Sequence, residues 1–302
     1  MIRRLLPWLI FAVFAAIPFL PVGGFVTLVA GRIMIFAIAA MSLDLILGVG
    51  GLPSFGHAAP IAIGAYAVAM LDAAGLNHLE YVLPAAMGAA CLFAVITGSV
   101  ALRARGINFI MITLAFAQMV FFAAGSLSDY GGDDGYSLTV RTDIAGQNLL
   151  KGGNLYFASL IALIGVWLLL RMIVASRFGR ALSAVRQNRV RVQAMGINAT
   201  AIELTALVIG AGIAALAGVL LANEAEFVSP AYAAWGRSGS LMVMVILGGL
   251  GSLHGAILGA AVVVLFEEGM GRYTQHWPLI FGVLLVLAVL FLRNGLAGVR
   301  RG

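Results

Sequence analysis

Long apolar runs alternate with short polar stretches along most of the chain. The runs lie at residues 5–22, 26–47, 58–75, 82–102, 107–126, 155–174, 200–222, 240–253, 256–270 and 278–293. A helix needs about 20 predominantly apolar residues to cross a membrane. The pattern predicts an all-α integral membrane protein with about ten transmembrane helices in one domain, residues 1–302. The first run resembles a signal peptide but lacks a small-residue cleavage site, so we expect it to stay as an uncleaved helix.

Two glycine-rich interruptions fall at corresponding positions in the two halves of the chain. The first reads LGVGGLPSFGHAAPIAIGA (47–65) and the second reads LGGLGSLHGAILGA (247–260). In each, Leu-Gly is followed by a glycine cluster, a serine, a histidine and a second run that opens with small residues. Interrupted hydrophobic segments at matching positions indicate an internal repeat and a transport path. Two ordinary hairpin turns are the alternative.

Polar residues in and near these interruptions are candidates for the transport path. Asp44 lies inside a predicted span, where an ionisable group is costly unless it is paired, hydrated or able to reach the interface. Each histidine is either a structural hydrogen-bonding residue or a functional ligand or proton carrier. The candidate path residues are Asp44, Ser54, His57, Gln118 and His254. Backbone bends or close helix packing should require glycine at Gly50, Gly51, Gly249, Gly251 and Gly255.

Composition agrees with a membrane protein. Hydrophobic residues make up 62% of the chain and charged residues 10%, whereas about 25% of the residues in soluble domains are charged. The formal net charge is +6, which in a membrane protein reports on topology rather than on nucleic-acid binding, so no nucleic-acid partner is expected. Cys91 is the only cysteine, which excludes an intrachain disulfide.

The distribution of basic residues predicts which loops face the cytoplasm. With the N-terminus inside, 13 of the 18 basic residues fall at the cytoplasmic ends of the spans. The others are Arg32, Arg141, Lys151, Arg237 and Arg272. An excess of Arg and Lys marks the cytoplasmic side of membrane proteins. We therefore expect both termini and segment 176–198 in the cytoplasm, and loops 127–154 and 223–239 outside.

Segment 176–198, SRFGRALSAVRQNRVRVQAMGIN, is too basic to enter the membrane. It contains five arginines and no acid. As a helix it would carry a narrow apolar stripe beside its arginines, and Gly196 would end that helix before the next span. Three roles fit this pattern: a helix on anionic lipid, a positive-inside anchor, and a docking helix for a cytoplasmic partner. The length of the segment favours docking.

Motifs for enzymatic or metal chemistry are missing from the sequence. Lys151 is the only lysine and is not part of a G-x-x-x-x-G-K-[ST] loop, so the chain lacks this means of binding ATP. Residues 129–135, DYGGDDG, lack the glycine and glutamate positions of a calcium loop, and no His/Cys cluster has zinc spacing. No paired catalytic acids or G-x-S-x-G motif occur in the spans. We expect no catalysis, cofactor or metal.

Five segments together resemble bacterial branched-chain amino-acid ABC transporter permeases. They are SLDLILGVGGLPSFGHAAPIAIGAYAVAML (42–71), RARGINFIMITLAFAQMVFF (103–122), GGDDG (131–135), segment 176–198 and GGLGSLHGAILGA (248–260). The start of the fifth span and the GGDDG loop resemble the LivM-type rather than the LivH-type subunit. One departure is Arg-Gln-Asn-Arg at 186–189, where acids are expected at the second and fourth positions, and it affects how a partner would dock.

The resemblance implies a permease subunit of an importer with a type II-like, ten-span fold in a bacterial inner membrane. Its partners would be a LivH-like permease, two cytoplasmic ATP-binding subunits, a periplasmic solute-binding protein and membrane lipid. Branched-chain or other hydrophobic amino acids are the expected substrates. Related permeases carry urea, short amides or sugars, and a secondary transporter is the alternative from another class. The segment would couple to the ATP-binding subunits through Phe178, Arg180, Leu182, Val185 and Arg186.

Overall fold

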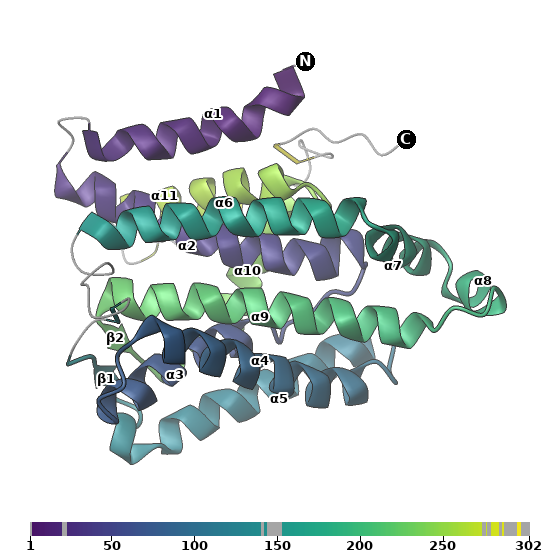
Figure 1. Ribbon diagram of the computed structural model, residues 1–302, viewed down its shortest axis with the longest axis horizontal. Coiled ribbons are helices and arrows are strands. Elements are labelled where there is room, and N and C mark those ends of the chain that lie inside the picture. Colours follow the sequence, from purple (N-terminus) through teal and green to yellow (C-terminus); the bar gives the residue numbers. More distant parts are fainter. Residues whose placement is uncertain are drawn as a thin grey trace.

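The computed structural model describes residues 2–19, 23–139, 142–143, 153–273, 276, 279–283, 286 and 295–296. Its helices are α1 (Ile2–Ala16), η1 (Ile17–Phe19), α2 (Gly24–Asp44), η2 (Leu45–Val49), α3 (Ala58–Ala73), α4 (Leu79–Ala101), α5 (Ile107–Ser126), η3 (Ser128–Tyr130), α6 (Gly153–Ala175), α7 (Arg177–Gln187), α8 (Arg189–Ala194), α9 (Ala199–Ala225), η4 (Pro230–Ala233), α10 (Trp235–Gly248) and α11 (Leu253–Gly271). Two short strands, β1 (Tyr136–Ser137) and β2 (Phe227–Val228), pair antiparallel, with Tyr136 opposite Val228. The long helices lie side by side along the longest axis (Figure 1).

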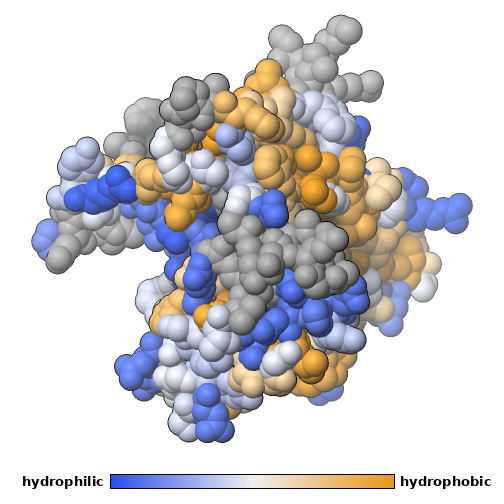
Figure 2. Space-filling view, turned by 60° about the vertical axis from the view of Figure 1, so that its left-hand side comes forward, coloured by the Kyte–Doolittle hydropathy of each residue, from blue (hydrophilic) through white to orange (hydrophobic). Residues whose placement is uncertain are grey.

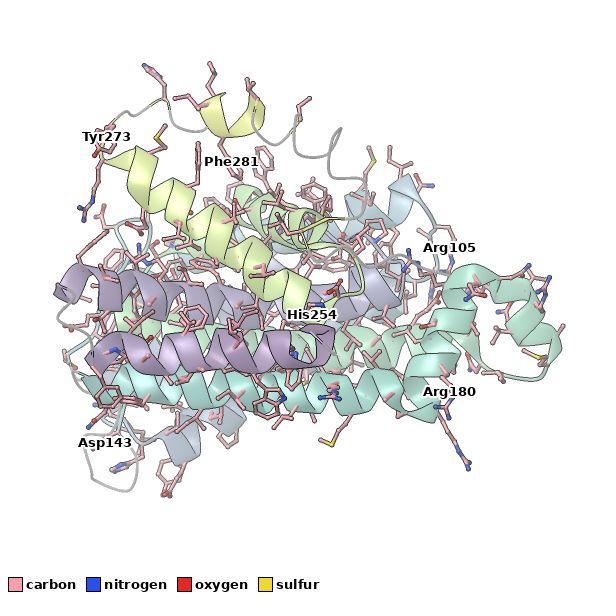
Figure 3. The ribbon with its side chains drawn as sticks, turned by 90° about the horizontal axis from the view of Figure 1, so that it is seen from above. Arg105, Asp143, Arg180, His254, Tyr273 and Phe281 are labelled. Carbon is pink, nitrogen blue, oxygen red and sulfur yellow. The ribbon has the colours of Figure 1, made fainter. Side chains whose placement is uncertain are left out.

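The two ends of this bundle differ in character. Helices α7 and α8 project at one end, here called the α8 end, and the strands lie at the other, here called the β1 end (Figure 1). Arg105 and Arg180 lie at the α8 end, and Asp143 and Tyr273 lie at the β1 end (Figure 3). Figure 2, which brings the β1 end forward, shows hydrophilic residues gathered there with hydrophobic residues beside them. Polar ends with apolar sides between them suit helices that cross a membrane.

The predicted spans agree closely with the helices. Within the described residues, six helices are long and apolar enough to cross a membrane: Gly24–Val49, Leu79–Ala101, Ile107–Ser126, Gly153–Ala175, Ala199–Ala225 and Leu253–Gly271. Pro7–Phe19 and Ala58–Ala73 are shorter apolar helices, and α10 has 14 residues. The tenth predicted span, 278–293, lies outside the described residues except for 279–283 and 286. The helical membrane architecture is confirmed, and the full count of ten stays a prediction.

Helices α2 and α9 form the centre of the bundle. In their most apolar windows 78% and 72% of the residues are buried, against 22% for both α4 and α5. Small residues let α9 pack closely against α3. A Cβ on Gly218 of α9 would overlap the Ile61 carbonyl, and a Cβ on Gly64 of α3 would overlap the Ala215 carbonyl. Lipid tails are as apolar as leucine, so close backbone packing of this kind is what holds membrane helices together.

The first interruption inserts non-helical chain into the bundle. The π-helix η2 continues α2, and residues 50–57 then lead to α3 without helix or strand. His57 Nε2 lies 2.7 Å from Ser42 Oγ, and the Ala58 amide donates to Ser238 Oγ at 2.9 Å. Helix α3 therefore begins partway along α2. It has 16 residues, or about 24 Å. Non-helical backbone at membrane depth is tolerated only where protein or a cavity surrounds it.

The second interruption is a tight turn between two closely packed helices. Residues 249–252 join α10 to α11, and Ser252 Oγ caps α11 by accepting a hydrogen bond from the Gly255 amide at 3.2 Å. A Cβ on Gly255 would overlap the backbone of Gly248, so the two helices meet backbone to backbone. The interruptions are therefore alike in sequence but differ in structure: the first enters the bundle, and the second is a helical hairpin.

Segment 176–198 forms two helices, which corrects the expectation of one. Asn188 has an extended backbone, with φ −157° and ψ 99°, and it separates α7 from α8. Its side-chain oxygen accepts a hydrogen bond from the Arg191 amide at 2.9 Å. The first amides of a helix have no intrahelical partner, so an asparagine here stabilises a new helix start. The segment is a helical hairpin with its own small core.

Candidate transport path and coupling segment

The two interruptions meet at a buried contact. Asp44 is fully buried, and its Oδ1 accepts a hydrogen bond from the Gly251 amide at 2.6 Å. Gly48 lies between these groups, because a Cβ at this position would overlap both the Asp44 carboxylate and the Gly251 amide. Asp44 is therefore enclosed by the chain itself. It links the first interruption to the second, and we refer to Asp44, Gly48 and Gly251 as the junction.

Backbone geometry explains the glycines at the predicted positions. Gly249 and Gly251 have φ values of 110° and 77°, a region that residues with a Cβ rarely adopt. Gly50 is limited by space instead, since a Cβ there would lie 2.6 Å from the Ile46 carbonyl oxygen. Side chains larger than hydrogen at these positions require the backbone to move.

Ser54 and His57 line a common cavity. It lies between the first interruption and α4, α5 and α9, has a volume of about 40 Å³, and is also lined by Thr97 and Thr113. The His57 ring is hydrogen-bonded to Ser42, which agrees with a structural histidine. A buried water needs a cavity volume of about 10–15 Å³, so this cavity has room for a few waters but is too small for an amino acid in this conformation.

Gln118 and His254 lie apart from this cavity. Gln118 is half-buried on α5, and its Nε2 has no hydrogen-bond partner within the described residues. His254 lies at the start of α11 (Figure 3), with Nε2 3.3 Å from Ser252 Oγ. The five predicted path residues therefore form no single cluster. Two share a cavity, one belongs to the junction, and the other two lie outside both.

The apolar face of α7 turns into the chain itself. Leu182 and Val185 are 0% and 4% exposed, and Phe178 packs half-buried against the same core. Leu182 and Val185 are therefore inaccessible to a partner in this conformation, because their own spans cover them. Arg180, in contrast, is exposed and points away from the bundle (Figure 3). A partner that docks on the hairpin must use another face of it.

Arg186 connects α7 to the junction. Its Nη1 donates a hydrogen bond to the Gly48 carbonyl. Its aliphatic stem lies against Gly51, where a Cβ would come within 2.6 Å of Arg186 Cγ. Because Gly48 also touches Asp44 and Gly251, Arg186 links α7 to both interruptions.

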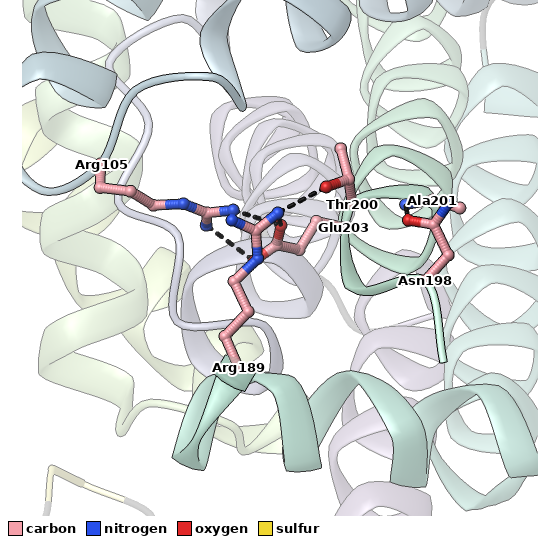
Figure 4. Close-up of polar contacts among 6 residues, drawn as sticks. All are labelled: Arg105, Arg189, Asn198, Thr200, Ala201 and Glu203. Atoms are coloured by element: carbon pink, nitrogen blue, oxygen red, sulfur yellow. Dashed lines mark hydrogen bonds and ion pairs between the residues drawn. The ribbon is translucent and has the colours of Figure 1, made fainter. Parts of the chain in front are cut away.

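An ion triad that the sequence analysis missed fixes α8 to the spans (Figure 4). Glu203 of α9 is 2% exposed and accepts hydrogen bonds from both terminal nitrogens of Arg105, at 2.8 and 2.9 Å. Arg189, the first residue of α8, lies 3.3 Å from the same carboxylate and also bonds Thr200. A buried carboxylate is stable only with such partners. The triad joins the loop before α5, the start of α8 and the first turn of α9.

The sequence does hold a signal for the triad. Asp44 and Glu203 are the two acids that the predicted topology leaves on the cytoplasmic side, and both lie within predicted spans. An acid in a span requires a cation or hydrogen-bond donors close by. Arg105 and Arg189 entered the sequence analysis only as topology markers. Their pairing with Glu203 depends on how α4, α8 and α9 pack.

Comparisons with known proteins agree with this architecture. The family described as "Branched-chain amino acid transport system / permease component" matches residues 25–292. This chain belongs to that family. The permease is similar to the high-affinity branched-chain amino acid transport system permease protein LivM of Salmonella typhimurium. The two are 30% identical over 297 residues, and this match covers 90% of this chain and 70% of LivM.

Two further relatives extend the comparison. The permease is 26% identical over 283 residues to LivH of Salmonella typhimurium, covering 87% of this chain and 91% of LivH. It is 24% identical over 310 residues to a probable branched-chain amino acid transport permease protein LivM of Methanocaldococcus jannaschii, covering 87% and 90%. No solved structure matches the permease. The resemblance found from the motifs is confirmed, and the family consists of transport components rather than enzymes.

Replacing Gly48 by leucine is expected to separate the two interruptions, because no side chain fits between Asp44 and Gly251. Overpacking of this kind costs about 1–3 kcal/mol or more. We expect a smaller monodisperse fraction in size-exclusion chromatography and loss of most transport. Gly165→Leu is the matched control, since a Cβ at Gly165 meets nothing within 4 Å. Equal behaviour of the two variants would contradict the junction.

Proposed function

We propose that the permease is half of a membrane-spanning pair that imports branched-chain amino acids across a bacterial inner membrane. Separate ATP-binding subunits would dock on α7 and α8 and drive the import. The observation that carries this proposal is the projecting α7–α8 hairpin (Figure 1), which Arg186 and the Glu203 triad tie to the spans. The chain also lacks an ATP-binding loop of its own.

The orientation follows from charge. The hairpin carries Arg177, Arg180, Arg186, Arg189 and Arg191 without an acid, so the α8 end would face the cytoplasm with both termini. The β1 end would face the periplasm. An even number of crossings, such as ten, would place both termini on the same side of the membrane. Helices α3 and α10 have 16 and 14 residues, and the non-helical segments beside them would complete their crossings.

The docking surface would lie on the outer side of the hairpin. Val190, Met195 and Ile197 are 75%, 63% and 40% exposed, and we call these three residues the α8 surface. Arg177, Arg180 and Arg191 of the same hairpin are also exposed. An apolar centre with arginine at its rim is typical of a protein interface, where a few anchors supply most of the binding energy. ATP-binding subunits fit this surface because they are the partners that a permease without its own ATP site requires.

Two rigid ties would transmit the motion of the ATP-binding subunits. The first runs from Arg186 to Gly48 at the junction. The second runs from Arg189 through Glu203 to the first turn of α9 and, through Arg105, to the start of α5. Helices that pack as closely as these move as units rather than deform. Displacement of the hairpin would therefore shift α9 and both interruptions together.

The remaining partners would use the other surfaces. Leu92 of α4, Phe122 of α5 and Ile161 of α6 are 62%, 69% and 70% exposed, and such apolar faces suit lipid and a second, LivH-like permease. The solute-binding protein would dock at the β1 end. There Asp72 accepts hydrogen bonds from the Thr139 amide and hydroxyl at 2.8 Å, so part of loop 127–154 is held firmly on α3.

Uptake measurements test the proposed function. Cells that express the permease with a second permease, the ATP-binding subunits and a solute-binding protein should accumulate labelled leucine against a gradient. Accumulation should stop when the ATP-binding subunits are inactivated. Accumulation that persists without them but follows an ion gradient would instead establish a secondary transporter.

Cysteine labelling in the same cells tests the orientation. In a Cys91→Ala background, an impermeant thiol reagent should label a cysteine at Asp129 but not one at Gln193, since both positions are exposed and lie at opposite ends. Labelling at Gln193 in intact cells would reverse the topology.

A further inference from the structure

A charged cavity lies at the β1 end between α2, α9, α10, α11 and η4. Its volume is about 110 Å³, which gives room for several waters. The lining consists of Arg32, Phe36, Leu221, Ala225, Tyr232, Arg237 and Glu267. It combines two cations, one anion and an apolar wall. Charged residues this close to membrane-spanning helices are costly and usually functional.

The cations of this cavity differ in how they are paired. Arg32 is held by two acids, Glu224 at 3.5 Å and Glu268. Arg237 has no carboxylate partner within the described residues, and its guanidinium lies 5.3 Å from the centre of the Phe36 ring. Arg32 thus has a structural explanation, whereas the charge of Arg237 is available to a ligand.

Glu267 supplies the opposite charge. It is half-buried, lines the same cavity, and makes no ion pair or side-chain hydrogen bond with any described residue. No ion pair joins it to Arg237, although both line the cavity. Arg237 and Glu267 therefore place charges of opposite sign around a common space, where a ligand that carries both charges would pair with each.

The apolar wall completes the chemistry. Phe36, Leu221 and Ala225 offer hydrocarbon surface, and Tyr232 presents its ring while its hydroxyl donates to the Phe227 carbonyl at 3.0 Å. Burial raises the pKa of the Tyr232 hydroxyl, and the charges of Arg237, Glu224 and Arg32 also act on it. Of these residues, Arg32 and Arg237 line the same cavity as Tyr232.

We propose that the charged cavity binds a zwitterionic amino acid with an aliphatic side chain. Its carboxylate would bind Arg237, its ammonium would bind Glu267, and its side chain would lie against Phe36 and Leu221. Arginine suits a carboxylate because its planar donors bind two oxygens. The proposal rests on the proposed function. It adds a site within the permease where a substrate stops after it leaves the solute-binding protein.

Photolabelling of the assembled transporter tests this site. A leucine analogue with a diazirine in its side chain would be applied to proteoliposomes that contain the whole complex, and labelled peptides would be identified by mass spectrometry. Label is expected on the peptides that contain Phe36 or Leu221. Excess leucine should compete, whereas 4-methylpentanoate, which lacks the ammonium, and 3-methylbutylamine, which lacks the carboxylate, should not.

Charge-neutral variants separate binding from structure. Arg237→Gln and Glu267→Gln should each reduce the competed label about tenfold or more, because each removes a charge-assisted hydrogen bond, while co-purification of the other subunits is unchanged. Arg272→Gln is the matched control at the same end. Its guanidinium lies over the Phe25 ring, outside the cavity.

Each outcome decides the question. If the wild-type complex transports leucine but the competed label falls on other peptides, or if both variants label like wild type, the site is overturned and the proposed function stands. If the wild-type complex shows no ATP-dependent leucine uptake, the proposed function fails, and competed label at Phe36 or Leu221 would still support an amino-acid site.

Discussion

Glu203→Gln is expected to lower the stability of the permease and to uncouple it from its ATP-binding subunits. The carboxylate receives two short hydrogen bonds from Arg105 and one ion pair from Arg189. Removing one partner of a buried ion pair typically costs about 3–5 kcal/mol. Here both arginines can reach water, since their side chains are 40% and 28% exposed. We therefore expect a loss of about 1.5–3 kcal/mol, the range for hydrogen bonds to charged groups.

The measurement combines stability with coupling. Thermal unfolding of the purified permease should show a lower Tm. Leucine uptake should fall further than the fraction of folded permease does, because α8 loses the ion pair of Arg189 with Glu203 that helps to fix it to α9. Glu80→Gln is the control, since Glu80 is an exposed acid at the other end of the bundle. If Glu203→Gln behaves like Glu80→Gln in both assays, the triad has no part in holding the hairpin.

Val190→Glu is expected to release the ATP-binding subunits without unfolding the permease. Val190 is 75% exposed, so the charge costs little in the free chain but becomes buried in a complex. Loss of an interface anchor typically costs 2 kcal/mol or more, which corresponds to about 30-fold weaker binding. Co-purification from detergent should show the permease pair intact and the ATP-binding subunits missing. Met195→Glu should act in the same way.

The controls distinguish docking from a lipid-surface role. Leu76→Glu makes the same change of charge at a 45% exposed leucine near the β1 end, and it should retain the ATP-binding subunits. Leu182→Glu is unsuitable as a test, because a charge at this buried position would disrupt α7 itself. If Val190→Glu and Met195→Glu keep the ATP-binding subunits with normal stimulated hydrolysis, the α8 surface contacts lipid or solvent instead.

The membrane-spanning segments were predictable from the sequence, because their length and composition identify them. The run at 26–47 became α2 with its π-helical extension, and the run at 200–222 became α9. A span must satisfy its own backbone hydrogen bonds and expose apolar side chains, and both are local properties. The turns at the glycine clusters were also predictable, because the need for a positive φ is a local property. Gly249 and Gly251 adopt backbone angles that their neighbours in sequence already suggest.

Residues that act through distant partners were decided by the tertiary structure. The sequence favoured a docking role for the apolar stripe of α7, but the fold covers Leu182 and Val185. The sequence predicted that Asn188 lies within one helix, whereas in the structure its side chain caps the start of α8. Asp44 is hydrogen-bonded to Gly251, which is 207 residues away in the sequence, and Glu203 to Arg105, which is 98 residues away. Hydrophobicity fixes which segments enter the membrane, but the pairing of buried charges depends on which helices pack side by side, and the order of residues along one helix does not contain that information.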